Sequence, residues 1–346
     1  AEAQLIDQEV EQILRAAGHT TETVPVYLGD LTWLDRCQKA DLVFNLCEGI
    51  GGVSRFEDYV VAALELARVP FTGCRSWPVT ICHRKHVANT LLQAAGVPVP
   101  PFALVHEPVV PEALRFPVIV KPSMEDASVG IDEGSVCHTP AALLDRLAKA
   151  TAAWEDVLVQ EYVAGREFNV GFIGATALPI SEIDFAGLGE GKPPIVTYAA
   201  KWEAGSDYDL HTIPVCPARI DKGTADKLTR VAERAWRALA KCEGYGRVDI
   251  RLDAAEETVA AIAQGGGTGV AFDADVRDRS EIESARDGAV NAFGHVDYLV
   301  NNAGLVRMSP LDELAEDEWD LVLDTNLKGM YLVTQAIAPV IARAGR

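Results

Sequence analysis

The sequence predicts an α/β protein of more than one domain, and three observations support this. Short apolar runs alternate with segments of helical periodicity, and glycine or proline stands at most of the breaks, which is typical of α/β chains. The chain has 346 residues, more than one ordinary core accommodates. Its charge balance also changes: residues 1–253 hold 24 basic and 35 acidic side chains, and residues 254–346 hold 7 and 16. We therefore expect a domain boundary near residue 253.

Composition and charge narrow the class of protein. The formal net charge is −20, so the chain repels phosphate backbones and anionic lipid surfaces, and we expect neither nucleic acid nor membrane as a partner. No apolar run reaches 18 residues, and the first residues lack the basic and apolar regions of a signal peptide. The seven cysteines are scattered without a C-x-x-C pair, which is typical of reduced thiols. We expect a cytoplasmic protein.

Helices and strands of the first 253 residues follow from the spacing of apolar residues and from their stops. Apolar positions at helical spacing end at Gly18 and again at Gly96, and the apolar run 116–122 ends at Pro122. The expected helices are 2–17, 56–67, 84–95, 140–153 and 221–241. The expected strands are 41–47, 116–122, 157–161 and 246–253, with a hairpin-like stretch over 167–182.

Beyond residue 253 the pattern starts again. The expected order is helix 255–263, strand 269–273, helix 279–293, strand 296–301 and a long helix over about 316–342. Strands that alternate with helices in this way predict part of a doubly wound sheet.

A lysine next to a small-residue loop is the first chemical signal. Lys121 ends an apolar strand and directly precedes loop 123–130, which is rich in hydroxyl and small residues. Backbone N–H groups and hydroxyls beside a fixed ammonium suit phosphate oxygens. Taken alone, Lys121 is better explained as a solvated strand-end lysine. The nearby Cys82-His83-x-x-His86 has no third ligand close in sequence, so we expect a solvated helix face there and no metal site.

The motifs around Lys121 resemble those of ATP-grasp enzymes, in particular the D-alanine–D-alanine ligase-like carboxylate–amine ligases. Lys-Pro-Ser-Met-Glu-Asp-Ala-Ser-Val-Gly-Ile (121–131) resembles their glycine-rich phosphate loop. Further motifs follow in the family's order: Phe-Asn-Leu-Cys-Glu (44–48), Val-Pro-Phe-Thr-Gly (69–73), Ala-Gly-Val-Pro-Val-Pro (95–100), Gln-Glu-Tyr-Val-Ala-Gly-Arg-Glu-Phe (160–168), Tyr-Ala-Ala-Lys-Trp (198–202), Cys-Pro-Ala (216–218) and Gly-Arg-Val-Asp (246–249). This ordered set covers some 250 residues and is far more specific than any one motif.

The resemblance implies a site for ATP and Mg²⁺, residue by residue. The implied phosphate ligands are Lys85, Lys121, Lys201 and the loop residues Glu125, Ser128 and Gly130. The implied adenine contacts are Gln160, Glu161 and the backbone at Val163, with Glu167 on the ribose hydroxyls. The implied catalytic residues are Arg247, which stabilises the tetrahedral transition state, with Lys201 and Ser128; Asp249 is the implied metal ligand. In such ligases a carboxylate attacks the γ-phosphate, and an amine then displaces phosphate from the acyl phosphate.

Two departures from the family pattern bear on activity. The chain begins at the helix that follows the family's first strand. No Glu-x-Asn pair follows Asp249 anywhere in residues 250–346, and the nearest echo, Asp324-x-Asn326, lies some 75 residues too late. Because Asp249 alone would hold Mg²⁺ weakly, we expect impaired catalysis.

Residues 254–346 resemble a second family, the short-chain dehydrogenases/reductases. The motifs are Phe272-Asp-Ala-Asp-Val-Arg-Asp278, Asp297-Tyr-Leu-Val-Asn-Asn-Ala-Gly304 and Asp324-Thr-Asn-Leu-Lys-Gly329. The resemblance implies that Asp275 flanks adenine and that Asn326 is a catalytic asparagine. It further implies that Asn301, Ala303 and Gly304 line the nucleotide cleft. The family's Thr-Gly-x-x-x-Gly-x-Gly loop and Tyr-x-x-x-Lys pair are absent, so we expect at most a vestigial NAD(P) site.

Together the two resemblances predict a partial Rossmann-like domain (1–75), small and large ATP-grasp subdomains (76–168 and 169–253) and a partial Rossmann fragment (254–346). The leading hypothesis is an ATP-dependent carboxylate–amine ligase acting on small, amino-acid-like substrates. An NAD(P)-dependent oxidoreductase fragment and a non-catalytic ATP-binding protein stay open. Residues 248–254 fit both families, which indicates recombination or an error of sequence assembly. Open sheet edges predict a homodimer as a further possibility.

Overall fold

The computed structural model describes residues 3–189, 191–306 and 314–343. The chain forms two compact units, residues 1–251 (the first unit) and 252–346 (the second unit), which are described separately. The finer division of the first unit into three segments stays a prediction. In the described ranges, no helix is long and apolar enough to cross a lipid bilayer.

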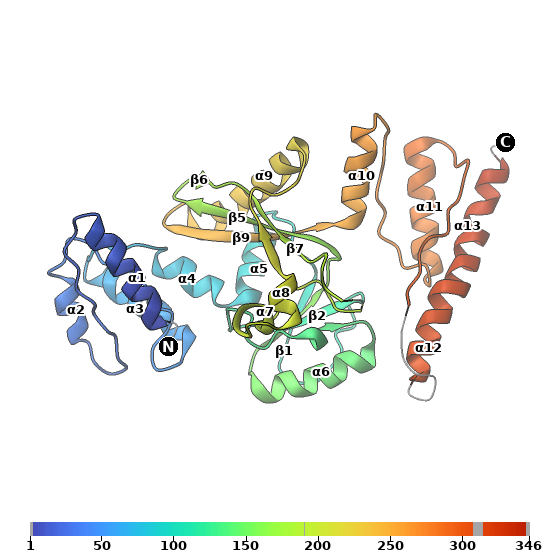
Figure 1. Ribbon diagram of the computed structural model, residues 1–346. Helices are drawn as coiled ribbons and strands as arrows, with labels where there is room; N and C mark the ends of the chain where they lie inside the picture. Colours follow the sequence, from blue (N-terminus) through green and yellow to red (C-terminus); the bar gives the residue numbers. More distant parts are fainter. Residues whose placement is uncertain (1–2, 190, 307–313, 344–346) are drawn as a thin grey trace. The chain divides into compact units, whose positions relative to one another are not determined.

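The first unit opens with helices (Figure 1): α1 (Ala3–Ala16), α2 (Thr32–Cys37), α3 (Glu57–Leu66), α4 (Ser76–Cys82) and α5 (Lys85–Ala94). Trp33 of α2 and Leu64 of α3 lie in a small buried core. The strand expected over 41–47 is wrong. Only Val43 forms an isolated parallel bridge, with Phe71, because the described residues supply no second strand along which a ladder could continue.

A four-stranded antiparallel sheet follows, in the order β1 (Phe102–Val105), β4 (Val157–Glu161), β2 (Val118–Pro122) and β3 (Val136–Cys137). Helix α6 (Pro140–Ala153) covers one face. It begins where expected because the Thr139 hydroxyl accepts a hydrogen bond from the Ala142 N–H and Pro140 occupies the first turn. Leu143 and Leu147 of α6 are fully buried against the sheet.

The register of this sheet separates its core from its polar face. Val120 pairs with Val159, and both side chains are buried beneath α6. Lys121 and Gln160 are each one residue further along these strands, so their side chains point to the opposite face. That face carries the polar groups described below.

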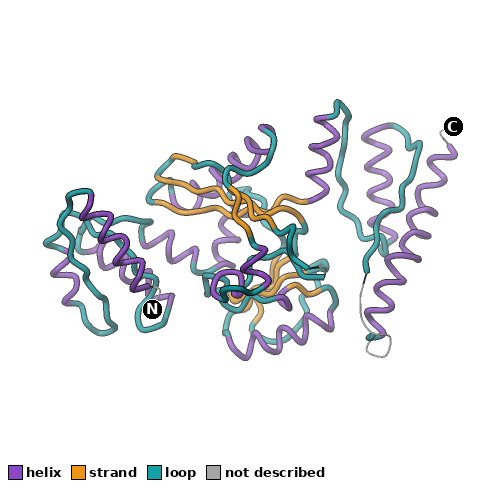
Figure 2. Tube along the Cα trace, in the orientation of Figure 1, coloured by secondary structure: helices purple, strands orange, loops and turns teal. Residues whose placement is uncertain are grey.

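A second antiparallel sheet contains β6 (Thr176–Ala177), β5 (Gly165–Ile173), β7 (Ser181–Asp184) and β8 (Ile213–Val215) in that order, and β9 (Tyr245–Asp253) pairs with β5. Short helices α7 (Tyr198–Trp202) and α8 (Asp207–His211) lie in the connection to β8. Helix α9 (Lys222–Ala240) starts at Asp221, whose carboxylate accepts hydrogen bonds from two backbone N–H groups, and packs on this sheet. Figure 2 shows the strands of both sheets.

Side chains along β5 and β9 alternate between two faces, one apolar and packed on α9, the other polar. Val170 and Phe172 of β5, with Val248 and Ile250 of β9, pack against α9. The residues between them therefore point away from α9. On β9 these are Arg247, Asp249 and Arg251, and on β5 they include Glu167 and Asn169.

The second unit is helical in its described residues. Helices α10 (Ala254–Gln264), α11 (Arg279–Phe293), α12 (Glu316–Leu323) and α13 (Met330–Arg343) confirm the expected helices, and a π-helical segment, Asp324–Gly329, joins the last two. The strands expected over 269–273 and 296–301 are wrong, because neither segment is a strand in the described part of the chain. Tyr298 and Val300 are 90% and 81% exposed. In the doubly wound order these two strands are not neighbours, so they would not form a ladder with each other.

Candidate functional site

Lys121 and Lys85 lie at the centre of the polar face. The Lys121 ammonium donates to Gln160 Oε1 at 3.3 Å, and the register makes these two residues diagonal neighbours on one face of the sheet. Burial, together with the positive charges of Lys85 and Arg251, lowers the pKa of Lys121 from 10.5 to about 8. Several cations are thus gathered at one place, an arrangement that suits a polyanion.

Loop 123–130 approaches the same lysines. The Lys85 ammonium donates to the Glu125 carbonyl and forms an ion pair with Asp126 at 3.5 Å. The loop can end as it does only with glycine at position 130, where φ is +74° and an added Cβ would lie 2.7 Å from Pro122 and from Trp154. Of the loop residues implied by the resemblance, Glu125 is therefore next to Lys85, and Gly130 packs against Pro122 and Trp154.

On its other side the loop is held by Trp202 of helix α7 and by Val196, which lies two residues before that helix begins. The Ser128 hydroxyl donates to the Val196 carbonyl at 2.8 Å, and the Trp202 indole N–H donates to the Ala127 carbonyl at 3.0 Å. Loss of solvent around the Lys201 ammonium and the positive charge of Arg247 lower the pKa of Lys201. Lys201 thus stands between the loop and strand β9.

The exposed face of β5 and β9 brings together a carboxylate, an arginine and an amide. Arg247 donates to both carboxylate oxygens of Asp249, at 2.6 and 3.1 Å, and Asn169 donates to one of them at 2.8 Å. The bond from Asp249 raises the pKa of Arg247. The residues implied as the oxyanion donor and the metal ligand are therefore paired with each other.

Arg251 is a residue of this face that the sequence analysis missed. It forms an ion pair with Glu167 at 2.8 Å and donates to the Val163 carbonyl at 3.4 Å. The available signal was the period-2 pattern of β9, in which Arg247, Asp249 and Arg251 alternate with apolar residues. That pattern predicts all three side chains on one face.

The side chain of Glu161 does not reach the site. It faces the side of β4 opposite to Gln160 and accepts from the backbone N–H and the guanidinium of Arg115. Because neighbouring residues of a strand point to opposite faces, Gln160 and Glu161 cannot both line one pocket with their side chains. The expected contact of Glu161 with adenine stays a prediction, and in this structure only the backbone of Glu161 is on the side of Gln160.

His83 also differs from expectation, because it is buried and not on a solvated face. Its Nε2 is 3.0 Å from Glu57 Oε2, and its Nδ1 is 2.9 Å from Asp126 Oδ2. The bond to Asp126 and then that to Glu57 raise the pKa of His83 to about 9. His86 bonds the buried Ser123 hydroxyl at 2.9 Å. His86 therefore anchors the start of loop 123–130, and His83 anchors its middle at Asp126.

Metal ligands are sparse. Within the described ranges, no group of three or more His, Cys, Asp or Glu side chains is arranged to hold a metal ion. Asp249 offers a carboxylate, but that carboxylate is already paired with Arg247. All seven cysteines are free thiols.

In the second unit, the residues implied for NAD(P) bond within the unit. Asp275 is paired with Arg277 at 2.6 Å, and the Asn301 amide donates to the Thr334 hydroxyl at 2.9 Å. Asn326 bonds both backbone groups of Leu305. The Asn326 amide also lies against Gly304, where an added Cβ would be 3.3 Å from its oxygen. Asn326 thus fixes the end of the segment that includes Ala303 and Gly304.

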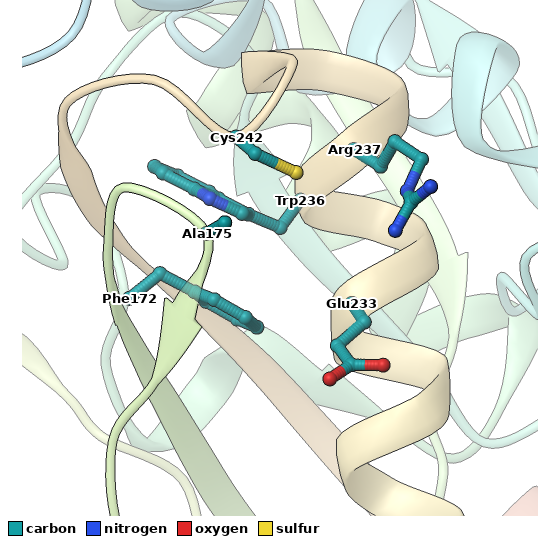
Figure 3. A pocket seen from close by; sticks show the side chains of 6 residues that line it. All are labelled: Phe172, Ala175, Glu233, Trp236, Arg237 and Cys242. Atoms are coloured by element: carbon teal, nitrogen blue, oxygen red, sulfur yellow. The ribbon is translucent and has the colours of Figure 1, made fainter.

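A small cavity of about 90 Å³ lies elsewhere in the first unit (Figure 3). Its lining residues are Phe172, Ala175, Glu233, Trp236, Arg237 and Cys242. The rings of Phe172 and Trp236 stack at 5.3 Å. Phe172 faces α9, on the side of β5 opposite to Glu167, so this cavity is separate from the polar face.

Comparison with known families separates the chain into two overlapping parts. A model described as the D-ala D-ala ligase C-terminus matches residues 91–262, and a short chain dehydrogenase model matches residues 235–346. The overlap, 235–262, contains residues 248–254, which fit both families. The two expected resemblances are confirmed.

Relatives agree with the first of these matches. An uncharacterized protein of Sinorhizobium fredii, y4sG, is 35% identical over 260 residues, covering 72% of this chain and 74% of that protein. A D-alanine–D-alanine ligase of Bordetella avium is 31% identical over 253 residues, covering 70% and 74%. The crystal structure of D-alanine–D-alanine ligase from Bacillus anthracis has a TM-score of 0.52 at 21% identity, covering 67% of this chain and 72% of that one. The expected α/β, ATP-grasp fold is confirmed.

Proposed function

Because the chain belongs to the D-alanine–D-alanine ligase family of ATP-grasp enzymes, we propose that its first unit binds ATP and joins a carboxylate to an amine through an acyl phosphate. The observation that carries this proposal is the meeting of Lys85, Lys121 and loop 123–130 on one polar face. Their cations and backbone groups suit a triphosphate. The relatives' names make amino-acid-like substrates the first choice.

The proposed reaction has two steps. A substrate carboxylate oxygen attacks the γ-phosphorus, and the bond from that phosphorus to the β-phosphate oxygen breaks, releasing ADP. The amine nitrogen then attacks the acyl carbon, inorganic phosphate leaves, and the amine loses a proton. Lys85 and Lys121 neutralise the phosphate charge, and Arg247 stabilises the oxyanion of the tetrahedral intermediate.

Magnesium does not fit these residues well. Mg²⁺ is ordinarily held by one or two carboxylates together with substrate phosphates. The described face offers two carboxylates, and both are engaged: Asp249 by Arg247 and Asn169, and Glu167 by Arg251. A metal would have to displace an arginine from its ligand. We therefore derive no step through Mg²⁺ and expect slow turnover.

The test is nucleotide binding and turnover by the full chain. ATP binding is measured by calorimetry, and phosphate release is measured with D-alanine as the probe substrate. We expect Lys121→Met to weaken ATP binding by about 10- to 100-fold, because a charge-assisted bond is lost. Lys149→Met, at an exposed position of α6, is the matched control and should bind ATP normally.

The outcomes separate the hypotheses. ATP binding with D-alanine-dependent phosphate release supports the ligase. ATP binding that depends on Lys121 without any phosphate release supports a non-catalytic ATP-binding protein instead. Preferential binding of NADPH over ATP would overturn the proposal in favour of the dehydrogenase fragment.

A further inference from the structure

The guanidinium of Arg251 lies on the side of strand β9 that points away from α9 and bonds several acceptors there. One terminal nitrogen donates to the carbonyls of Val163 and Gly165, at 3.4 and 3.3 Å. The other donates to the Glu167 carboxylate at 2.8 Å and to the Pro194 carbonyl. Acceptors from two separate chain segments, residues 163–167 and Pro194, thus meet on a single cation.

This arrangement is enclosed. The side chains of Arg251 and Glu167 are 17% and 15% exposed. The guanidinium carbon also lies 5.2 Å from the centre of the Tyr162 ring, and the Tyr162 hydroxyl accepts a further bond at 3.2 Å. A planar guanidinium has its donors in a fixed fork, so these hydrogen bonds and the Tyr162 ring contact together hold it in one place.

The acceptors held by Arg251 are those that the proposed function assigns to the nucleoside. Val163 supplies the backbone of the adenine contact, and Glu167 supplies the ribose carboxylate. A nucleoside would have to span the same two groups that the guanidinium now spans. We propose that Arg251 occupies the nucleoside end of the site and must be displaced before adenosine phosphates bind in full. This inference rests on the proposed function and names the residue that limits nucleotide affinity.

The proposal divides the site into two ends that respond differently. The phosphate end, at Lys85 and Lys121, does not involve a hydrogen bond from Arg251. Inorganic tripolyphosphate should therefore bind the native chain without displacing Arg251. The nucleoside of ATP should add little binding affinity, because it must displace Arg251 to bind. Removing the guanidinium should tighten ATP and leave tripolyphosphate unimproved, because one positive charge near the phosphates is also lost.

The experiment is calorimetric titration of the full chain with ATP and, separately, with tripolyphosphate. Arg251→Met keeps the length of the side chain but removes all donors. Arg237→Met, in α9 on the opposite side of the second sheet, controls for the loss of one positive charge. We expect Arg251→Met to bind ATP at least about tenfold more tightly than the native chain, while tripolyphosphate affinity is unchanged or slightly weaker. Arg237→Met should change neither affinity.

Arg251→Lys provides a second variant if the methionine variant does not fold. Its ammonium keeps the charge but cannot span Val163 and Glu167 with one planar fork, so ATP should bind with intermediate affinity. Native or weaker ATP binding by the folded variants overturns the inference, as does equal tightening of ATP and tripolyphosphate. If neither ATP nor tripolyphosphate binds any folded variant or the native chain, the proposed function itself fails. These two failures are therefore distinguishable.

Discussion

Two short apolar segments of this chain adopt different structures. Strand β4, Val157–Glu161, lies between β1 and β2, and its first three side chains are at most 1% exposed. Residues 296–301, Val-Asp-Tyr-Leu-Val-Asn, have a similar apolar content, yet Tyr298 and Val300 are almost fully exposed. β4 has a strand on each side and a helix over one face, whereas residues 296–301 join no sheet within the described ranges. An apolar run becomes a strand only where its backbone groups find partners.

Hydrogen exchange tests this contrast most directly. Amides of Leu158 and Val159 should exchange at least about a thousandfold more slowly than those of Tyr298 to Val300, because β4 opens only with its sheet. Exchange of the full chain followed by mass spectrometry measures both segments in one sample. Equal protection would show that 296–301 pairs in solution, for example with a second copy.

Core packing gives a second, smaller contrast. Leu147→Ala empties a site that is fully buried under the first sheet, and we expect a loss of about 3 kcal/mol in unfolding free energy. Leu323→Ala removes the same atoms from a side chain of α12 that is 39% exposed, and should cost less than about 1 kcal/mol. Denaturant titration of both variants checks the difference. Comparable losses would mean that the second unit is packed as tightly as the first.

The helices could be predicted from the sequence because their signals are local. Helix α6 carries its start at Thr139 and Pro140, and α11 lies between Asp278 and Gly294, which begin and end it. Strands β2 and β4 were also predictable, since each is a continuous apolar run. The segments 41–47, 269–273 and 296–301 were not, because pairing depends on distant residues that no local pattern reports.

The residues of the candidate site divide in the same way, into those predicted by a local motif and those that depend on distant contacts. Lys121 and its loop could be found from one contiguous motif. Arg251 could not be placed, because its partner Glu167 lies 84 positions away in the chain. His83 was misread because its partners, Glu57 and Asp126, come from other elements. Both errors, at Arg251 and at His83, arise because the contacts join segments that are distant in sequence.

The smallest expected effect is the contribution of His83 to stability, which can be followed by measuring the unfolding free energy as a function of pH. The pKa of His83 is raised from 6.5 to about 9 by its carboxylate partners, so its contribution is complete below pH 6.5 and is lost as the pH rises through 9. Because Asp126 is half exposed, we expect only about 1 to 2 kcal/mol.

His83→Gln is the measurement for this contribution. The difference in unfolding free energy between the native chain and this variant should be largest at pH 6 and should shrink towards zero by pH 9.5. His295→Gln, in the second unit, serves as the control. A difference that stays constant across this range would show that His83 is held neutral by its surroundings.

Strand β9 has a consequence for how the two families could be joined. Its odd-numbered residues supply the chemistry and its even-numbered residues supply the core, and the stretch that fits both families lies within it. Inserting or deleting one residue before Arg247 would exchange the two sets, burying the charges and exposing Val248 and Ile250. A joining event between residues 247 and 251 would therefore have to preserve parity as well as reading frame, because an offset of one residue would move charged side chains into the core positions.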